Sequence, residues 1–179
     1  MPGTAVRTPT AARRAAILDA ALIEFNQHGI AGASIEDIRR RSGASVGSIY
    51  HHFGGKEGVA EALYLEGLRD YQDGFIRALA EAASTRAGVK AGVNHHLSWI
   101  AEHREQGRFL FLGQSADERS IGELNRRFVG AISKWMAPAI ACGELRDLTP
   151  VLLSALWIGP SQELARHWLA GRTKGPLMD

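Results

Sequence analysis

Residues able to carry chemistry are concentrated between Ser42 and Gly58, in the stretch SGASVGSIYHHFGGKEG. The stretch contains an adjacent histidine pair, His51 and His52, and a lysine, Lys56, that follows two glycines. Histidines ligate metals, a lysine after a glycine-rich turn can hold a phosphate, and aromatic and basic side chains on a short helix can read DNA. The spacing of these residues discriminates between the three kinds of site.

The spacing does not fit a metal site or a nucleotide-binding loop. Adjacent residues on a helix point about 100° apart, and no second pair of ligands lies one turn away from His51 and His52. A phosphate-binding loop of the GxxxxGK[ST] type requires a serine or threonine after the lysine and a strand before the loop. Here Glu57 follows Lys56, and no strand pattern precedes it. The hypothesis that remains is a surface that reads DNA.

Two short helices are predicted to position these residues. They span Ser34–Arg41 and Ser45–His52, and each begins with a serine whose hydroxyl can cap the helix. The turn between them, Ser42-Gly43-Ala44, has the length and the glycine of a helix-turn-helix motif. In such a motif the second helix enters the major groove, and its N-terminal residues meet base edges.

The outward face of the second helix supplies the candidate DNA-contacting residues. Its first residues are small, which lets the backbone approach the bases, and Lys56 with the first N–H groups of the next helix suits a phosphate. Two alternatives stay open: Tyr50 can be a half-buried aromatic, and Arg39-Arg40-Arg41 can be a solvated helix face. The candidates are Ser45, Val46, Gly47, Ser48, Tyr50, His51, His52 and Lys56.

Composition and charge agree with a folded protein that has a basic N-terminal end. Of the 179 residues, 45% are hydrophobic, which is enough for a buried core, and the net charge is +2. Seven basic and four acidic side chains give residues 1–56 a charge of +3, so the remainder carries −1. A basic end on a near-neutral body indicates a polyanionic partner, and a solvated charged surface is the alternative.

Cysteine content and hydropathy bear on the location. The one cysteine, Cys142, excludes an intrachain disulfide and favours the reducing cytoplasm. The N-terminus lacks the continuous apolar segment of a signal peptide, and no run of about 18 apolar residues predicts a membrane span. We therefore expect a cytoplasmic protein.

The rest of the chain shows helical periodicity, so the predicted fold is all-α. Apolar residues recur at spacings of three and four, without sustained β alternation or internal repeats. We expect a first helix over residues 11–27, a later helix that ends near Gly107, and another that Pro138 kinks or ends. Thr149-Pro150 predicts a helix start, and Gly159-Pro160 predicts an interruption of the last helix.

These motifs resemble the TetR family of bacterial transcriptional regulators. The match runs from Arg13 to about Leu63 and includes GASIEDIRRRSGASVGSIYHHFGGKE, in which SVGSIYHHF followed by Lys56 is the most specific part. The stretch GPSQELARHWLAGR, residues 159–172, resembles the last helix of many members. Arg39 departs from the pattern, since a small alanine is usual there, and its stem must reach solvent or the helix must be displaced.

The resemblance implies a homodimer in which each subunit has a three-helix DNA-binding head and a larger helical bundle that binds a small molecule. We therefore expect a flexible arm over residues 1–10, a helix-turn-helix domain over 11–55, and a ligand-binding and dimerisation domain over 56–179. By position in the motif, bases are faced by Ser45, Val46, Gly47, Ser48 and His51. Phosphate contacts are implied for Tyr50, His52, Lys56 and Ser34, with the footprint extended by Arg7, Arg13 and Arg14.

The larger domain contains all four tryptophans and offers candidates for two further sites. An apolar ligand pocket between helices is predicted to include Trp99, His103, Phe111, Trp135 and Trp157. A dimer interface is predicted to include Leu152, Leu156, Leu164 and Trp168. Packing within the core of one chain is the alternative for every one of these residues.

The expected function is that of a sequence-specific transcriptional repressor that binds a palindromic DNA operator as a homodimer and is released by a small molecule. We expect no cofactor, no metal, no membrane association and no enzymatic activity. The alternative is a helical enzyme or metal-binding protein that uses His95, His96 and His103, although no nucleophile lies at a convincing spacing from a base. A regulator that responds to a protein partner instead of a small molecule is a third possibility.

Overall fold

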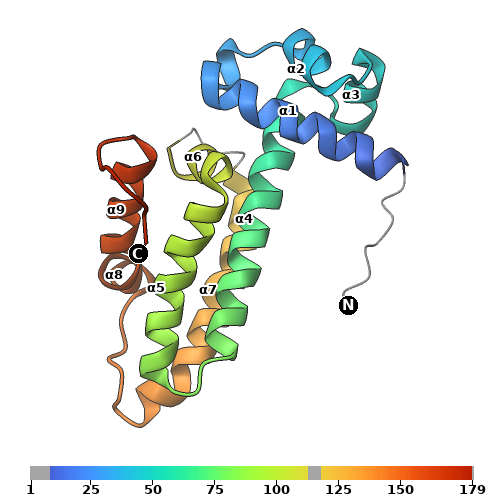
Figure 1. The fold of residues 1–179 in the computed structure, drawn as a ribbon. Coiled ribbons are helices and arrows are strands. Elements are labelled where there is room, and N and C mark those ends of the chain that lie inside the picture. Colours follow the sequence, from blue (N-terminus) through green and yellow to red (C-terminus); the bar gives the residue numbers. More distant parts are fainter. Residues whose placement is uncertain (1–8, 113–117, 179) are drawn as a thin grey trace, which may run out of the picture. The chain divides into compact units, whose positions relative to one another are not determined.

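The structure is a computed structural model that describes residues 9–112 and 118–178. Over these residues the chain forms nine α-helices and no β-strand, which confirms the predicted all-α fold (Figure 1). The helices are α1 (Pro9–Gly32), α2 (Ile35–Ser42), α3 (Val46–Phe53), α4 (Lys56–Ala80), α5 (Thr85–Glu102), α6 (Arg104–Leu112), α7 (Glu118–Ala141), α8 (Pro150–Trp157) and α9 (Gly159–Leu169).

The helices belong to two compact units, and the chain passes from the first unit to the second within α4, between Leu65 and Glu66. In the first unit α1 packs on α2, and α2 packs on α3. Burial of each large apolar side chain contributes about 1.5–3 kcal/mol, which fixes the short helices on α1. The core of this unit includes Ile17, Leu18, Phe25, Ile38, Ile49, Val59 and Leu63.

The two short helices begin and end through local interactions that the sequence predicted. The hydroxyls of Ser34 and Ser45 each accept a hydrogen bond, 3.1 Å long, from the backbone N–H three residues further on. Both serines are therefore helix caps, as expected. Helix α2 ends at Gly43, whose φ of 68° lies in the left-handed region that glycine adopts without strain.

Helix α1 differs in extent from the prediction. It begins at Pro9 rather than at residue 11, because the fixed φ of proline suits the first turn of a helix and its missing N–H is not needed there. Its regular path is interrupted at Gly29, where φ is 69° and ψ is 165°. The predicted flexible arm lies, apart from Pro9 and Thr10, outside the described residues.

The second unit is a helical bundle in which α5 and α7 run alongside the C-terminal part of α4 (Figure 1). Gln72 of α4 donates a hydrogen bond to Asn125 of α7 at 2.9 Å, and His95 of α5 donates one to the carbonyl of Tyr71 at 2.9 Å. Helix α9 packs against α5, α6 and α8. These contacts enclose an aromatic core between the helices.

The predicted helix end near Gly107 was wrong, and of the two effects expected of Pro138 the helix does not end there, while a kink stays a prediction. Gly107 lies inside α6, where it is buried and faces Ile100, so its missing side chain permits close packing instead of ending a helix. Pro138 lies inside α7, which continues to Ala141. Proline removes one backbone donor from a helix, and the chain tolerates this loss one turn before the helix ends.

The predicted start of α8 and the predicted interruption before α9 were both correct. Thr149 caps α8, with Pro150 in the first turn. Helix α8 ends at Trp157, and α9 begins at Gly159 after an interruption at Ile158. No helix in the described part of the chain combines the length and the apolar character that crossing a bilayer requires.

Candidate functional site

Helix α3 exposes the residues that the sequence predicted to contact DNA. Ser45, Gly47 and His51 are exposed, and Val46 and Tyr50 retain 40% and 53% of their accessible surface. Both side chains therefore keep a large apolar or aromatic surface that a partner can contact. The opposite face of the helix carries Ile49, which is fully buried, while Ser48 and His52 are half-buried.

The amino-terminal ends of α2 and α3 present hydrogen-bond donors. The first N–H groups of a helix have no partner within the helix, and they carry a partial positive charge that attracts phosphates. The Ser34 hydroxyl is committed, because it accepts from the N–H of Asp37 and donates to the Asp37 carboxylate. The Ser45 hydroxyl accepts from the N–H of Ser48, and this bond does not use the hydroxyl proton. Ser45 is therefore the better placed of the two to donate to a polyanion.

The ammonium of Lys56 has a structural role that the sequence did not indicate. Its Nζ donates to the carbonyl oxygens of Ala31, at 3.1 Å, and Ala33, at 3.0 Å. These bonds join the start of α4 to the chain that leaves α1. An ammonium has three donors, so one remains for a phosphate after these two bonds.

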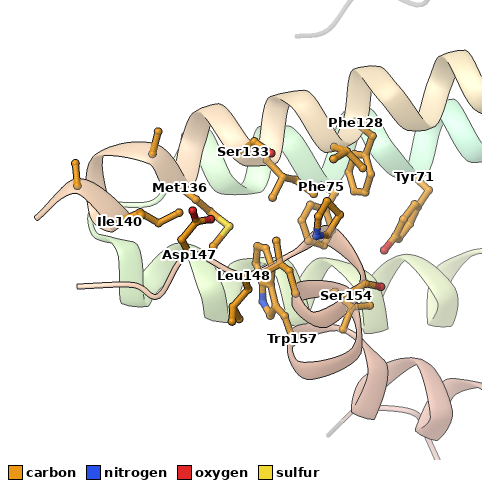
Figure 2. A pocket seen from close by; sticks show the side chains of 17 residues that line it. Tyr71, Phe75, Phe128, Ser133, Met136, Ile140, Asp147, Leu148, Ser154 and Trp157 are labelled. Atoms are coloured by element: carbon orange, nitrogen blue, oxygen red, sulfur yellow. The ribbon is translucent and has the colours of Figure 1, made fainter. Parts of the chain in front are cut away.

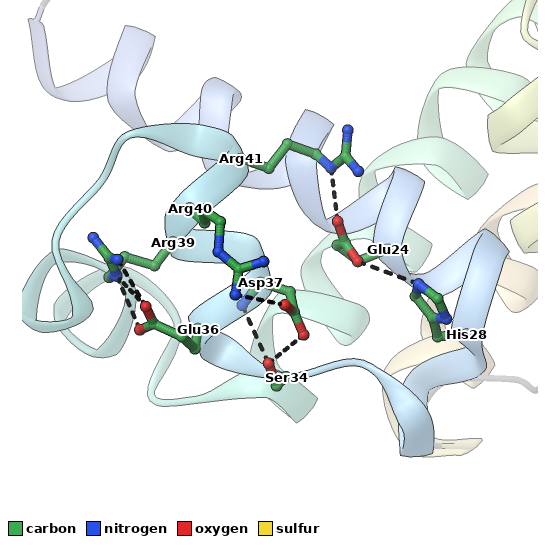
Figure 3. Close-up of polar contacts among 8 residues, drawn as sticks. All are labelled: Glu24, His28, Ser34, Glu36, Asp37, Arg39, Arg40 and Arg41. Carbon is green, nitrogen blue, oxygen red and sulfur yellow. Dashed lines mark hydrogen bonds and ion pairs between the residues drawn. The ribbon is translucent and has the colours of Figure 1, made fainter.

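The arginines of α2 are paired with carboxylates of the same unit (Figure 3). Arg39 forms a two-pronged ion pair with Glu36, with its shortest N–O distance at 2.7 Å, and Arg40 lies 3.1 Å from Asp37. The hydrogen bond from Arg39 lowers the pKa of Glu36, and the hydrogen bond from Ser34 lowers the pKa of Asp37. Both pairs are exposed to solvent, so phosphates can compete for the two guanidinium groups.

The third arginine of this run, Arg41, contacts a buried carboxylate. Its Nε lies 2.7 Å from Oε1 of Glu24, whose side chain is only 8% exposed (Figure 3). His28, one turn further along α1, lies 3.7 Å from the other oxygen of Glu24. The Arg41–Glu24 pair joins α2 to α1. It thereby positions α2, the helix on which α3 packs.

Two of the remaining basic candidates, Arg13 and Arg14, lie near the start of α1. Arg13 is exposed, and the guanidinium of Arg14 lies 5.2 Å from the centre of the Phe53 ring, a cation–π contact with the end of α3. Arg7 lies outside the described residues.

A second candidate site is an apolar cavity of about 690 Å³ in the C-terminal unit, a volume within the usual range for small-molecule sites (Figure 2). The lining comes from α4, α7, α8 and the segment before α8. It consists of Tyr71, Phe75, Phe128, Val129, Ile132, Ser133, Met136, Ala137, Ile140, Ala141, Asp147, Leu148, Pro150, Leu153, Ser154, Trp157 and Ile158.

Four aromatic rings form one end of the cavity. Phe75 is in edge-to-face contact with Phe128 and Trp157, at centroid distances of 5.3 and 5.5 Å, and Tyr71 lies 6.1 Å from Phe75. The Trp157 indole donates to the carbonyl of Val89 at 2.8 Å, which fixes the ring against α5. Such arrays are rigid and present apolar faces and edges to a ligand.

The five predicted pocket residues occupy different places. Trp157 lines the cavity, whereas Trp135 stacks on Trp157 at 6.1 Å and lines a separate hollow of about 360 Å³. Trp99, His103 and Phe111 are not among the residues that line the large cavity. Trp99 instead stacks on His103 at 4.8 Å.

Tyr71, Phe75 and Asp147 line the cavity but were not singled out from the sequence. Tyr71 and Phe75 are spaced four apart on α4, a pattern that a buried core helix shows equally well. The available signal was the presence of glycines on the facing helix: Gly88 and Gly92 of α5 leave room for large rings.

The histidines of α5 form hydrogen bonds within the core. The Tyr71 hydroxyl lies 2.9 Å from Nδ1 of His96, whose Nε2 has no hydrogen-bond partner among the described residues. Burial raises the pKa of Tyr71, lowers the pKa of His96 to about 4, and lowers the pKa of His95. Nδ1 of His103 bonds to the carbonyl of Trp99 at 3.0 Å. Over residues 9–112 and 118–178, no three histidine, cysteine or acidic side chains gather in a cluster suited to a metal.

Three of the four predicted interface residues expose apolar surface. Leu152, Leu156 and Leu164 retain 51%, 68% and 46% of their accessible area, and neighbouring Val151 is also exposed. Trp168 is half-buried, donates to the carbonyl of Gly175 at 3.0 Å and packs against Arg104. The described part of the chain leaves the first three residues partly exposed, and we refer to these three leucines of α8 and α9 together as the patch.

Comparison with known proteins gives a match to the N-terminal domain and longer matches that extend over more of the chain. Residues 17–63 match the family described as bacterial regulatory proteins, tetR family. The HTH-type transcriptional regulator BetI of Burkholderia thailandensis is 28% identical over 156 residues, which cover 82% of this chain and 80% of that protein. The BetI of Paraburkholderia phymatum is 34% identical over 115 residues, which cover 63% of this chain and 59% of that protein. In three BetI relatives at 34–38% identity, the match spans only 42–59% of the relative's length.

Solved structures share the fold over most of the chain. The fatty acid degradation regulator FadR from Bacillus halodurans is 24% identical, with a TM-score of 0.77 over 91% of this chain and 90% of that one. FadR from Bacillus subtilis, solved in complex with stearoyl-CoA, is 21% identical, with a TM-score of 0.78 over 91% and 90%. At these identities the likeness establishes a common fold for both units.

Proposed function

The N-terminal domain of this chain belongs to the tetR family of bacterial regulatory proteins, and from this premise we propose that the whole protein is a ligand-responsive, sequence-specific DNA-binding transcriptional regulator. The observation that carries the proposal is the exposed face of α3, which follows a serine-capped helix and a glycine turn. A helix presented in this way fits the major groove, with its first residues at base edges. We assign the helix-turn-helix domain to residues 11–55, the preceding residues 1–10 to an arm, and residues 56–179 to ligand binding and dimerisation.

The assigned DNA contacts combine base readout with phosphate contacts. Bases are read by Ser45, Val46, Gly47, Ser48 and His51, while phosphate contacts come from Tyr50, His52, Lys56 and the amino-terminal end of α2 at Ser34. The small residues at the start of α3 and the exposed Tyr50 support this assignment. Phosphates can replace the carboxylate partners of basic groups such as the arginines of α2. Because this attraction is electrostatic, DNA binding is expected to weaken steeply with salt.

The regulator is assigned as a homodimer on a palindromic operator. Two half-sites about 34 Å apart require two copies of α3 held at a fixed separation. The uncovered patch of Leu152, Leu156 and Leu164 supports pairing of α8 and α9 with the same helices of a second copy. We further propose that the protein acts in the cytoplasm, where its DNA target lies.

The effector is assigned as a small molecule bound in the 690 Å³ cavity, and its binding is proposed to release the repressor from DNA. A fold neighbour, FadR, was solved in complex with stearoyl-CoA, which supports a small-molecule ligand, and the cavity supports a site for it in the C-terminal unit. Such a ligand acts by binding one conformation more tightly than the other. Nothing in the geometry of His95, His96 and His103 favours the enzyme alternative, since one ring nitrogen of each is hydrogen-bonded to a side chain or backbone carbonyl of α4 or α5.

Selection of bound duplexes from a random pool tests this function. We expect enrichment of a palindrome whose half-sites lie about one helical turn apart, bound by two subunits or a multiple of two. Failure to enrich any duplex at low ionic strength would contradict the proposal. A screen for molecules that release the selected duplex then tests the effector.

A further inference from the structure

The cavity lining carries negative charge and no positive charge among the described residues. Of its 17 lining residues, Asp147 is the one charged side chain, and lysine, arginine and histidine are absent from the lining that the described residues form. The other polar groups are the hydroxyls of Tyr71, Ser133 and Ser154. The Tyr71 hydroxyl is already hydrogen-bonded to His96. A ligand inside this cavity therefore meets apolar surface, two serine hydroxyls and a single negative charge.

The carboxylate and the aromatic rings lie at opposite ends of the cavity. Figure 2 shows Asp147 beside Met136 and Ile140, away from Tyr71 at the other end. Asp147 belongs to the segment between α7 and α8 and is exposed, so it lies where the cavity opens to solvent. Phe75 and Tyr71 are buried. The cavity thus has an aromatic interior and a negatively charged opening.

From this layout we propose that the effector is a cationic amphiphile, with an apolar body among the aromatic rings and a single positive group, such as an ammonium, at Asp147. The inference rests on the proposed effector role of the cavity. An anionic head group at this opening would meet a like charge, and deeper in the cavity it would lose water without gaining a cationic partner. A cation at the opening gains the attraction of the carboxylate, while the apolar body of the same ligand packs against the aromatic rings.

The charge pattern separates this chain from what its fold neighbours suggest. Bacillus subtilis FadR was solved with stearoyl-CoA, whose phosphates are anionic. At 21% identity the shared fold does not transfer a ligand, and the lining described here offers no positive side chain to an acyl anion or a phosphate. The sign of the ligand's charge is therefore a property of this chain's own residues.

Three probes with the same ten-carbon chain test the sign of the charge: decyltrimethylammonium, 1-decanol and decanoate. Calorimetric titration of the full chain is expected to rank them in that order of affinity. One favourable charge pair at a solvent-exposed position corresponds to about a fivefold change in affinity. Asp147→Asn should therefore weaken the ammonium probe by about fivefold and leave decanol unchanged.

Glu144→Gln is the matched control. Glu144 lies three residues before Asp147, accepts a hydrogen bond from Thr85 at 2.8 Å and does not line the cavity. Removal of its charge should leave the affinities of all three probes unchanged. An equal loss in both variants would trace the preference to general surface charge and overturn the inference.

The remaining outcomes separate the inference from the function on which it rests. Decanoate binding at least as tightly as the ammonium probe would overturn the cationic assignment and leave an effector-binding regulator standing. If no probe binds, the cavity is not a site for such amphiphiles and the inference is wrong. In that case, titration of the selected operator duplex with the same protein preparation decides separately whether the DNA-binding function holds.

Discussion

Gly92 of α5 lies against the Trp157 indole so closely that a Cβ at position 92 would stand 2.7 Å from Cζ2 of that ring. The same Cβ would lie 2.8 Å from Cζ of Phe75. Carbon atoms do not approach this closely without displacement, so the absence of a side chain at Gly92 lets two rings of the cavity lining meet α5. One glycine therefore sets the position of the aromatic end of the cavity.

Gly92→Ala is expected to destabilise the protein and distort the cavity. Overpacking a well-packed core costs about 1–3 kcal/mol, and replacing a helical glycine recovers about 0.5–1 kcal/mol. The net loss should be about 1 kcal/mol in urea unfolding, with weaker effector binding. Gly130→Ala on α7 is the control, because a Cβ there meets no atom within 4 Å. That variant should be as stable as the parent or more stable.

Tyr50→Ala and Lys56→Ala should separate DNA binding from stability. Tyr50 is 53% exposed, so its truncation is expected to weaken operator binding by about tenfold while unfolding stays within about 0.5 kcal/mol. Lys56→Ala removes the bonds to Ala31 and Ala33, so it should weaken DNA binding and also lower stability by about 1 kcal/mol. Band-shift titrations and urea unfolding of both variants provide the comparison. Unchanged operator affinity in Tyr50→Ala would remove that residue from the DNA surface.

Arg41→Met is predicted to be more damaging than Arg40→Met. Among the described residues, the first variant leaves the buried Glu24 carboxylate with His28, 3.7 Å away, as its ion-pair partner, and an under-paired buried acceptor costs about 1–3 kcal/mol. The second removes an exposed pair with Asp37, which contributes about 0–1 kcal/mol. The midpoint of urea unfolding measures both. Equal effects would mean that the Arg41–Glu24 pair does not hold α2 on α1.

Features set by neighbouring residues could be predicted from the sequence, and features set by distant residues could not. Ser34 and Ser45 cap helices because each bonds to a backbone N–H only three residues away, so the local pattern sufficed. The second bonding role of Lys56 depends on carbonyls 23 and 25 residues away, which no local pattern reveals. The exposure of Tyr50 followed from its place opposite Ile49, which was expected on the inner face and is buried, whereas Val46, expected on the same face, is 40% exposed.

The cavity was harder to predict because its lining brings α4 together with α7 and α8. Trp157 was identified from its type, but Trp99, which was equally attractive on composition, is stacked on His103 and bonded to Asp70. Tyr71 has the spacing of an ordinary core residue, and only its position beside the cavity distinguishes it. A hydrophobic stripe indicates that a residue is buried, and it does not indicate whether a void lies next to it.

Leu156→Glu should shift the protein from dimer to monomer. Leu156 is 68% exposed and lies in the patch with Leu152 and Leu164, so a charge there would be buried unpaired in the proposed interface. Sedimentation is expected to show the monomer, and operator affinity should fall because two half-sites no longer bind together. Leu112→Glu on α6, at a position 41% exposed and outside both the patch and the cavity lining, provides a control for added charge. A variant that remains dimeric would place the interface elsewhere.

Stability should fall as the pH drops below about 6.5, because His96 is buried in its neutral form. Burial lowers its pKa from 6.5 to about 4 in the folded protein, so between these values the unfolded chain binds a proton that the folded chain does not. Protons therefore favour unfolding, and His96 alone should remove up to about 3 kcal/mol of stability between pH 7 and pH 4.

Urea unfolding at pH 7.5, 6.5 and 5.5 measures how the free energy of unfolding depends on pH. In His96→Gln the amide can still bond to Tyr71 but cannot titrate in this range. The dependence of its unfolding free energy on pH should therefore be shallower by up to one proton. His95, whose pKa is shifted in the same direction, contributes to both proteins. Identical slopes for the two proteins would show that His96 takes up its proton without unfolding.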